Sequence, residues 1–173
     1  DVIHYKPNDI TVDAVWGTLA FKLDNFTNKK AAILGCGNIG FKLALKLVES
    51  GVNVRIHRRD KDKGLLMEEA INSIKPQSCN SSAKYFLSSS EAAKSCDIVI
   101  GSSSGNQVIN SKIIENMPTD SILIDVGKGN ISNNALNKAL ESDISVFRGD
   151  VTSALLGFIL QSEKSKDFVA KKM

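Results

Sequence analysis

The sequence contains three glycines with the spacing of a phosphate-binding turn. Gly35, Gly37 and Gly40 satisfy the pattern G-x-G-x-x-G. In a dinucleotide-binding unit the first glycine permits a sharp turn off a strand, the second lets the backbone approach a pyrophosphate, and the third lets a helix pack closely on the sheet. The unpaired N–H groups that open this helix also attract phosphate. The predicted cofactor-binding residues of this segment are Gly35, Cys36, Gly37, Asn38, Ile39 and Gly40.

The segments on both sides of the glycines support this prediction. Residues 31–34 form an apolar run of strand length, and Ile39, Leu43 and Leu47 repeat at helical spacing. Gly51 stands where the end of a helix favours a left-handed residue. Short glycine patterns also recur by chance in α/β proteins that bind nothing, so the prediction depends on this order of strand, turn and helix.

The end of the second predicted strand, residues 54–59, indicates which dinucleotide is bound. An NAD-selective site usually has Asp or Glu here, bonded to the ribose hydroxyls, whereas this sequence has His57, Arg58 and Arg59 and no carboxylate before Asp60. An arginine at this place can pair with a 2′-phosphate. The sequence therefore predicts NADP rather than NAD. The alternative is that both arginines belong to a solvated charged turn, together with the lysines that follow.

Small residues follow the fourth predicted strand, residues 97–101. They are Ser102, Ser103 and Ser104. Such residues leave room for a flat nicotinamide ring. The fifth predicted strand, residues 121–127, ends at Gly127 on the same edge, so Gly127 is a further predicted cofactor contact and Lys128 is the candidate for a polar group that meets the substrate. A lysine in such a loop is more often solvated, and neither a catalytic proton donor, nor a serine–histidine–acid arrangement, nor a metal site is identified.

The alternation of apolar runs with helical patterns predicts an α/β fold. Six strands at 31–34, 54–59, 85–87, 97–101, 121–127 and 145–147 fit a doubly wound, mostly parallel Rossmann sheet in the order 3-2-1-4-5-6 with helices on both faces. Residues 1–28 are predicted as a lead-in, extended over 1–9, and an N-terminal helix from a Thr11 cap to about Phe26. Residues 29–173 are predicted as the NAD(P)-binding domain, closed by a helix from Thr152.

Composition limits the class of protein. The 173 residues are 42% hydrophobic and 24% charged, as in ordinary soluble domains, and the net charge of +3 gives no reason to expect a nucleic-acid or membrane partner. No apolar run is long enough to span a membrane, and no secretory signal is visible. Three cysteines without metal-ligand spacing favour a reducing, cytoplasmic setting, with the Cys36 side chain expected to pack in the interior.

Several of these segments resemble known families. They are Lys29–Gly40, His57–Arg59 and Asp97–Ser104. Together they resemble the NADP-binding domain shared by shikimate dehydrogenase and glutamyl-tRNA reductase, whose Asn-Arg-Thr segment uses its arginine to hold the 2′-phosphate; the resemblance gives that role to Arg58. Residues 124–127 and 149–151 resemble methylenetetrahydrofolate dehydrogenase. Because these families carry a substrate domain ahead of this one, the resemblance implies a partner in the form of such a domain or a second copy of the chain.

The sequence therefore predicts the cofactor-binding domain of an NADP-dependent oxidoreductase that acts on a small carbonyl- or imine-like substrate. One alternative is a non-catalytic NAD(P)-binding module with a sensing or structural role, which the lack of an identified proton donor favours. A methyltransferase that uses S-adenosylmethionine is the third possibility. Such a site normally has an acid for the ribose at the end of the second strand, and this sequence lacks that acid.

Overall fold

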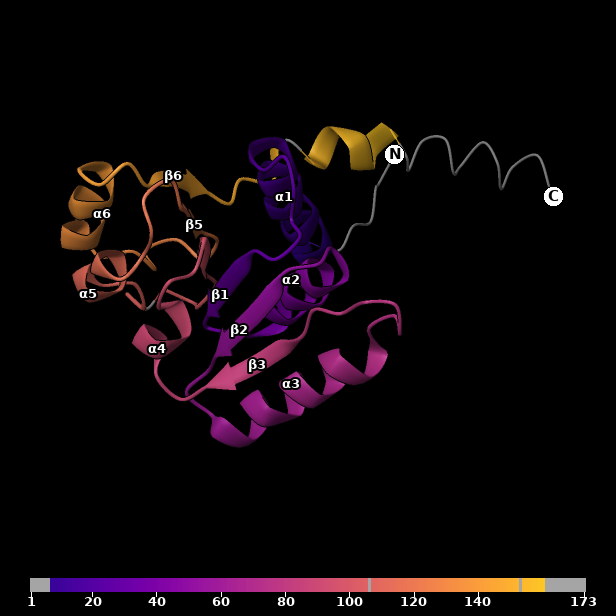
Figure 1. Ribbon diagram of the computed structural model, residues 1–173. Helices are drawn as coiled ribbons and strands as arrows, with labels where there is room; N and C mark the ends of the chain where they lie inside the picture. The colour runs from indigo at the N-terminus through magenta and orange to yellow at the C-terminus, as the bar shows by residue number, and fades with distance from the viewer. Residues whose placement is uncertain (1–6, 106, 153, 161–173) are drawn as a thin grey trace.

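The strands form one parallel sheet in the order β3-β2-β1-β4-β5-β6 (Figure 1), as predicted. The computed structural model describes residues 7–105, 107–152 and 154–160. The strands are β1 Lys30–Leu34, β2 Asn53–His57, β3 Ala83–Phe86, β4 Ile98–Gly101, β5 Ile122–Asp125 and β6 Ser145–Arg148. The strand order reverses between β1 and β4, which is where doubly wound sheets bind their ligands.

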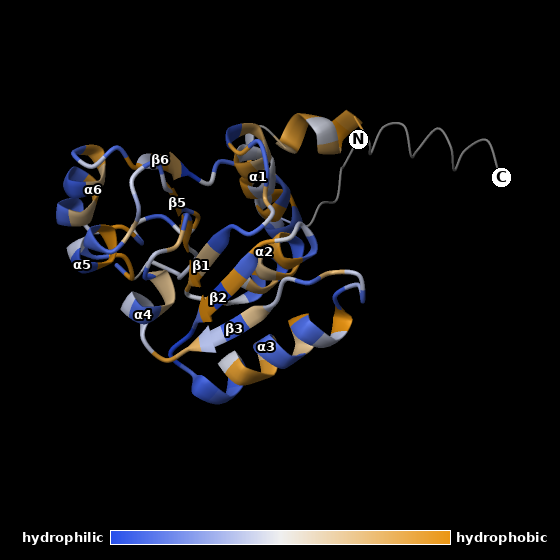
Figure 2. Ribbon diagram, in the orientation of Figure 1, coloured by the Kyte–Doolittle hydropathy of each residue, from blue (hydrophilic) through white to orange (hydrophobic). Residues whose placement is uncertain are grey.

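Helices cover both faces of the sheet because its central strands are apolar on both sides. In β1, Ala31 and Ile33 belong to one buried cluster, and Ala32 and Leu34 belong to the other. Figure 2 shows the hydrophobic residues of this strand. The helices are α1 Pro7–Lys22, α2 Asn38–Glu49, α3 Lys61–Ile74, α4 Ser89–Ala93, α5 Ser111–Glu115 and α6 Asn133–Leu140. The first three pack in the first cluster and the last three in the second.

The predicted start of α1 is wrong. The helix already includes Pro7, so residues 7–9 are helical rather than extended, and it ends at Lys22 rather than near Phe26. Thr11 is an interior residue whose hydroxyl donates to the Pro7 carbonyl at 2.9 Å instead of capping the helix. Proline is well suited to the first turn of a helix, where its missing N–H has no partner to lose. The rest of the predicted lead-in falls on residues 1–6, outside the described part.

The other boundaries differ from prediction by a few residues. Helix α3 begins at Lys61, because the Asp60 carboxylate caps it by accepting from the Lys63 backbone N–H at 3.1 Å. Strand β5 ends at Asp125 rather than Gly127, and β3 begins two residues earlier than predicted. Residues 154–160 of the predicted C-terminal helix are helical, and residues 153 and 161–173 lie outside the described part. Gly51 has the predicted left-handed conformation, with φ of 94°.

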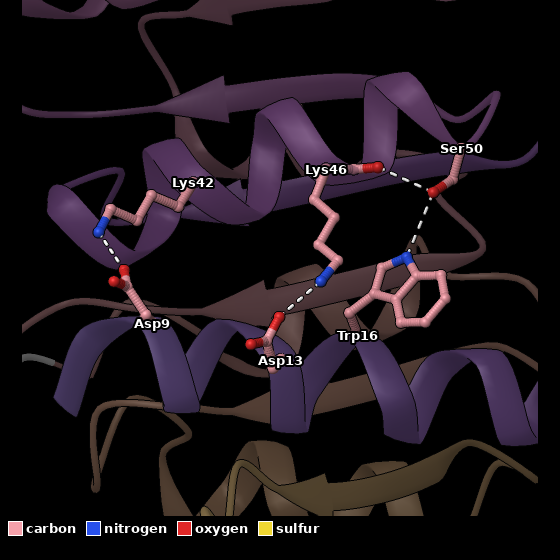
Figure 3. Close-up of polar contacts among 6 residues, drawn as sticks. All are labelled: Asp9, Asp13, Trp16, Lys42, Lys46 and Ser50. Carbon is pink, nitrogen blue, oxygen red and sulfur yellow. Dashed lines mark hydrogen bonds and ion pairs between the residues drawn. The ribbon is translucent and has the colours of Figure 1, made fainter. Parts of the chain in front are cut away.

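Helix α1 packs along α2 through an apolar interface edged by polar contacts (Figure 3). Lys46 Nζ lies 2.6 Å from the Asp13 carboxylate, and Lys42 pairs with Asp9. The Trp16 indole N–H donates to Ser50 Oγ at 3.2 Å. Trp16 is half-buried at this edge and stacks on Phe26, rather than lying in the core.

We predict that burial, not ion pairing, holds α1 on the sheet. Leu19 is fully buried, so Leu19→Ala should lower the free energy of unfolding by about 2–5 kcal/mol. The matched change Asp13→Asn removes a half-exposed ion pair and should cost less than about 1 kcal/mol. Urea denaturation of both variants measures the difference. Equal losses would show that the ion pair contributes as much as burial and would contradict the prediction.

Candidate cofactor-binding site

A cleft of about 420 Å³ lies at the carboxyl edge of the sheet, where β1, β2 and β4 end. This volume is typical of small-molecule sites. Nine of the thirteen predicted cofactor contacts line it: Gly35, Cys36, Gly37, His57, Arg58, Arg59, Ser102, Ser103 and Ser104. The other four, Asn38, Ile39, Gly40 and Gly127, lie outside the lining. Asp60 and Val108 complete the cleft.

The three glycines meet three different steric demands. Gly35 has φ of 90°, and a Cβ there would lie 2.6 Å from the backbone N of Ser103, so only glycine lets these two loops touch. A Cβ at Gly40 would lie 2.8 Å from Ser102 Oγ, so this glycine allows α2 to pack closely on the sheet, as predicted. Around Gly37 no atom lies within 4 Å of an added Cβ. The space beside Gly37 is therefore open.

The first turn of α2 lacks a side-chain cap. Its N-cap residue is Gly37, which makes no such bond, whereas α3, α4, α5 and α6 are each capped by a side chain. The Phe41 N–H donates to the Gly37 carbonyl at 2.8 Å, and the N–H groups of the residues before it have no partner within the helix. In contrast, the N–H groups of Gly35 and Cys36 both donate to the His57 carbonyl at 3.0 Å. The N–H donors that open α2 without a partner in the helix are therefore those of Asn38, Ile39 and Gly40.

The β2–α3 turn places cationic side chains at one end of the cleft. Arg58 Nη1 donates to the Cys36 carbonyl at 3.1 Å and thereby joins this turn to the glycine-rich loop. His57 Nδ1 lies 3.1 Å from the Phe86 carbonyl, and Arg59 is exposed. The Asp60 carboxylate, which caps α3, accepts from the Lys63 backbone N–H, and this bond lowers the pKa of Asp60.

Hydrogen bonds to the glycine-rich loop and to buried Asn130 fix the loop after β4. The Ser102 hydroxyl donates to the Gly35 carbonyl at 3.0 Å, and the Ser103 N–H and hydroxyl reach Asn130 Oδ1 at 3.0 and 2.6 Å. Asn130 is fully buried and donates through Nδ2 to Asp125 at 2.7 Å. Sequence reasoning missed Asn130, although an amide that follows a buried strand at the ligand edge was an available signal. No feature of the sequence indicates that Val108 lines the cleft.

Gly127 packs against the loop that follows β4 and is not part of the cleft lining. A Cβ at this position would overlap the Ser103 carbonyl oxygen and lie 2.5 Å from Asn130 Nδ2. Lys128 is exposed, with φ of 59°, and is not part of the lining. The Cys36 thiol is buried, as predicted, and burial raises its pKa to about 12.

The described part of the chain holds neither a metal-ligand cluster nor a membrane-spanning helix. Within 7–105, 107–152 and 154–160, no three His, Cys, Asp or Glu side chains gather as metal ligands. Over the same residues, every helix is too short or too polar to cross a bilayer. All three cysteines are free thiols.

Known structures share this fold at low sequence identity. A dipicolinate synthase chain from Bacillus halodurans is 16% identical with a TM-score of 0.64, over 81% of this chain and 47% of that one. Shikimate dehydrogenase from Aquifex aeolicus is 17% identical (TM-score 0.62; 85% and 51% covered), and the pyruvate reductase of Chlamydomonas reinhardtii is 23% identical (0.61; 84% and 47%). The chain spans about half the length of these proteins.

The resemblance to shikimate dehydrogenase thus holds at the level of the fold, and the similarity to methylenetetrahydrofolate dehydrogenase stays a prediction. Comparison with curated proteins gave no match. The family model for the NAD-binding domain of D-isomer specific 2-hydroxyacid dehydrogenases matches residues 5–154, which include α1 and all six strands. The chain therefore belongs to this family of dehydrogenase NAD-binding domains.

Proposed function

We propose that this chain is the cofactor domain of an NADP-dependent oxidoreductase that acts on a small carbonyl- or imine-like substrate. The observation that carries the proposal is the uncapped first turn of α2 beside the open space at Gly37, at the point where the strand order reverses. A pyrophosphate placed there would accept from the N–H groups of Asn38 and Ile39. The family match favours a nicotinamide dinucleotide over S-adenosylmethionine.

The preference for NADP is proposed from the chemistry of the β2–α3 turn. One N–H of the Arg58 guanidinium donates to the Cys36 carbonyl. Because a guanidinium carries five N–H donors, further N–H groups remain for a phosphate. Strand β2 ends in His57 rather than an acid, and the Asp60 carboxylate is engaged in capping α3. These features support a 2′-phosphate at Arg58 and Arg59. The matched family is described as NAD-binding, so a comparison of NADPH with NADH binding tests this preference.

The substrate would meet the cofactor at the Ser102–Ser104 end of the cleft. When bound, the nicotinamide ring would supply the hydride, and the protein would bind and orient this ring. The family description names 2-hydroxyacids, whose carboxylate would be matched by a cation, and exposed Lys128 on the adjacent loop is our candidate. Among the described residues that line the cleft, the one imidazole, His57, belongs to the β2 end. The proton donor is therefore proposed to come from a substrate domain or from a second copy of the chain.

We also propose a partner domain and a reducing, cytoplasmic setting for the whole protein. This chain covers about half of each of these matched structures, which supports a further domain as partner. Three free thiols fit the predicted reducing, cytoplasmic setting.

The competing function is a module that binds NAD(P) without chemistry, which the lack of an assigned proton donor in the described cleft favours. Incubation of the intact protein with 4-deuterated NADPH and a panel of 2-oxo acids separates the two functions. Stereospecific transfer of the label to a product supports the oxidoreductase. Tight cofactor binding with no transfer to any member of the panel supports the module.

The pyrophosphate position predicts the effect of Gly37→Val. The added side chain would fill the open space beside the loop, so the binding of both NADPH and NADH should be lost while the melting temperature changes little. Gly17→Val in α1 is the matched control, because its surroundings are equally open and lie outside the cleft. Undiminished cofactor binding by Gly37→Val in a calorimetric titration would refute the phosphate site.

The proposed role of Arg58 predicts a selective loss. Arg58→Ala should weaken NADPH binding by about 1.5–3 kcal/mol, the usual value for hydrogen bonds to a charged group, and NADH binding by much less. Lys61→Ala, at the first residue of α3 and outside the cleft lining, should change neither. Dissociation constants from fluorescence titration give the comparison. Equal weakening of the two cofactors would contradict the assignment.

The candidate role of Lys128 predicts a change in substrate binding alone. Lys128→Gln should raise KM for a 2-oxo acid by about tenfold or more, since a charged hydrogen bond to a carboxylate is lost, and Lys128→Arg should retain most of the affinity. The NADPH dissociation constant should stay the same in both variants. An unchanged KM in Lys128→Gln would show that this lysine is merely solvated.

A further inference from the structure

Arg58 is held at both its backbone and its side chain. The guanidinium donates to the Cys36 carbonyl at 3.1 Å and lies 3.9 Å from Met67 Sδ. The carbonyl of the same residue accepts from the Tyr85 hydroxyl at 3.1 Å. Tyr85 belongs to β3, in register with Ile56 of β2, two residues before Arg58. A residue outside the cleft lining thus fixes the backbone from which Arg58 extends.

The Tyr85 ring is itself fixed by α3. A Cβ at Gly64 would overlap the ring, so this helical glycine is what allows the ring to lie against the helix. The Glu68 carboxylate, one turn further along α3, accepts from the Tyr85 backbone N–H at 2.5 Å. Packing and hydrogen bonding therefore set the direction of the Tyr85 hydroxyl toward the turn.

This arrangement would prepare Arg58 for an anion. A long side chain normally loses rotamer freedom when it binds a ligand, and this loss is smaller if the side chain is already held in place. Here the Tyr85 bond fixes one end of Arg58 and the Cys36 carbonyl fixes the other. The remaining N–H groups of the guanidinium stay available at the cleft.

We propose that Tyr85 is a positioning residue for cofactor selectivity: its hydroxyl holds the Arg58 carbonyl so that the guanidinium stands ready for the 2′-phosphate of NADP. This inference rests on the proposed NADP function. Tyr85 would act entirely through Arg58, without touching the cofactor. Loss of the Tyr85 hydroxyl should therefore weaken binding of a cofactor with a phosphorylated ribose and leave the pyrophosphate contacts of α2 intact.

Tyr85→Phe tests the inference, because it removes the hydroxyl and keeps the ring that packs against α3. In the intact protein, the dissociation constant for NADPH should rise about twofold to tenfold, as expected for one neutral hydrogen bond, while that for NADH should stay within about twofold. Unchanged NADH binding also reports that the site is folded. Thr18→Val is the matched control: it removes a hydroxyl that donates to the Ala14 carbonyl at 3.0 Å in α1, and both constants should be unchanged.

The same substitution in an Arg58→Ala background shows whether the effect passes through Arg58. Tyr85→Phe should then have no further effect on NADPH, and adenosine 2′,5′-bisphosphate compared with AMP should give the same pattern as the two cofactors. A loss that persists in the Arg58→Ala background, an equal loss for NADPH and NADH, or no loss at all would overturn the inference. A wild-type protein with no preference for NADPH would instead refute the proposed cofactor choice, before any variant is compared.

Discussion

The contact between two loops at the carboxyl edge of the sheet is the constraint on which the rest of the cleft depends. Gly35, directly after β1, lies against the backbone of Ser103, after β4, so closely that no side chain fits between them. A parallel sheet brings these strand ends to one edge, but it does not by itself bring their loops into contact. The left-handed conformation of Gly35 does so, and it turns the following residues toward the start of α2.

The second half of the sheet reinforces this contact. Gly127 packs on the Ser103 carbonyl, and the fully buried Asn130 links Ser103 to Asp125 through hydrogen bonds. A buried amide with all these partners is costly to disturb, because the partners would be left unsatisfied. One side of the cleft is thus rigid. The other side is formed by the β2–α3 turn, where Arg58 reaches across to the glycine-rich loop.

Much of this arrangement was predictable from local sequence. The glycine pattern and the apolar runs predict β1 and α2, because both elements depend on residues that are close together in the sequence. The alternation of strands with helices predicts the strand order, because doubly wound sheets share a common order. The role of Gly127 was not predictable in the same way, since the need for glycine arises from a loop more than twenty residues earlier in the chain. The contact between Tyr85 and Gly64 is equally non-local. The start of α1 was misjudged for a different reason: Thr11 fits the usual preference for a cap, whereas the helix includes Pro7.

A crystal structure of the intact protein with bound NADPH would show where the dinucleotide lies. We expect pyrophosphate oxygens on the N–H groups of Asn38 and Ile39, with the 2′-phosphate in contact with the Arg58 guanidinium. A cofactor bound outside this cleft, or a cleft filled by the protein's own side chains at saturating NADPH, would contradict it.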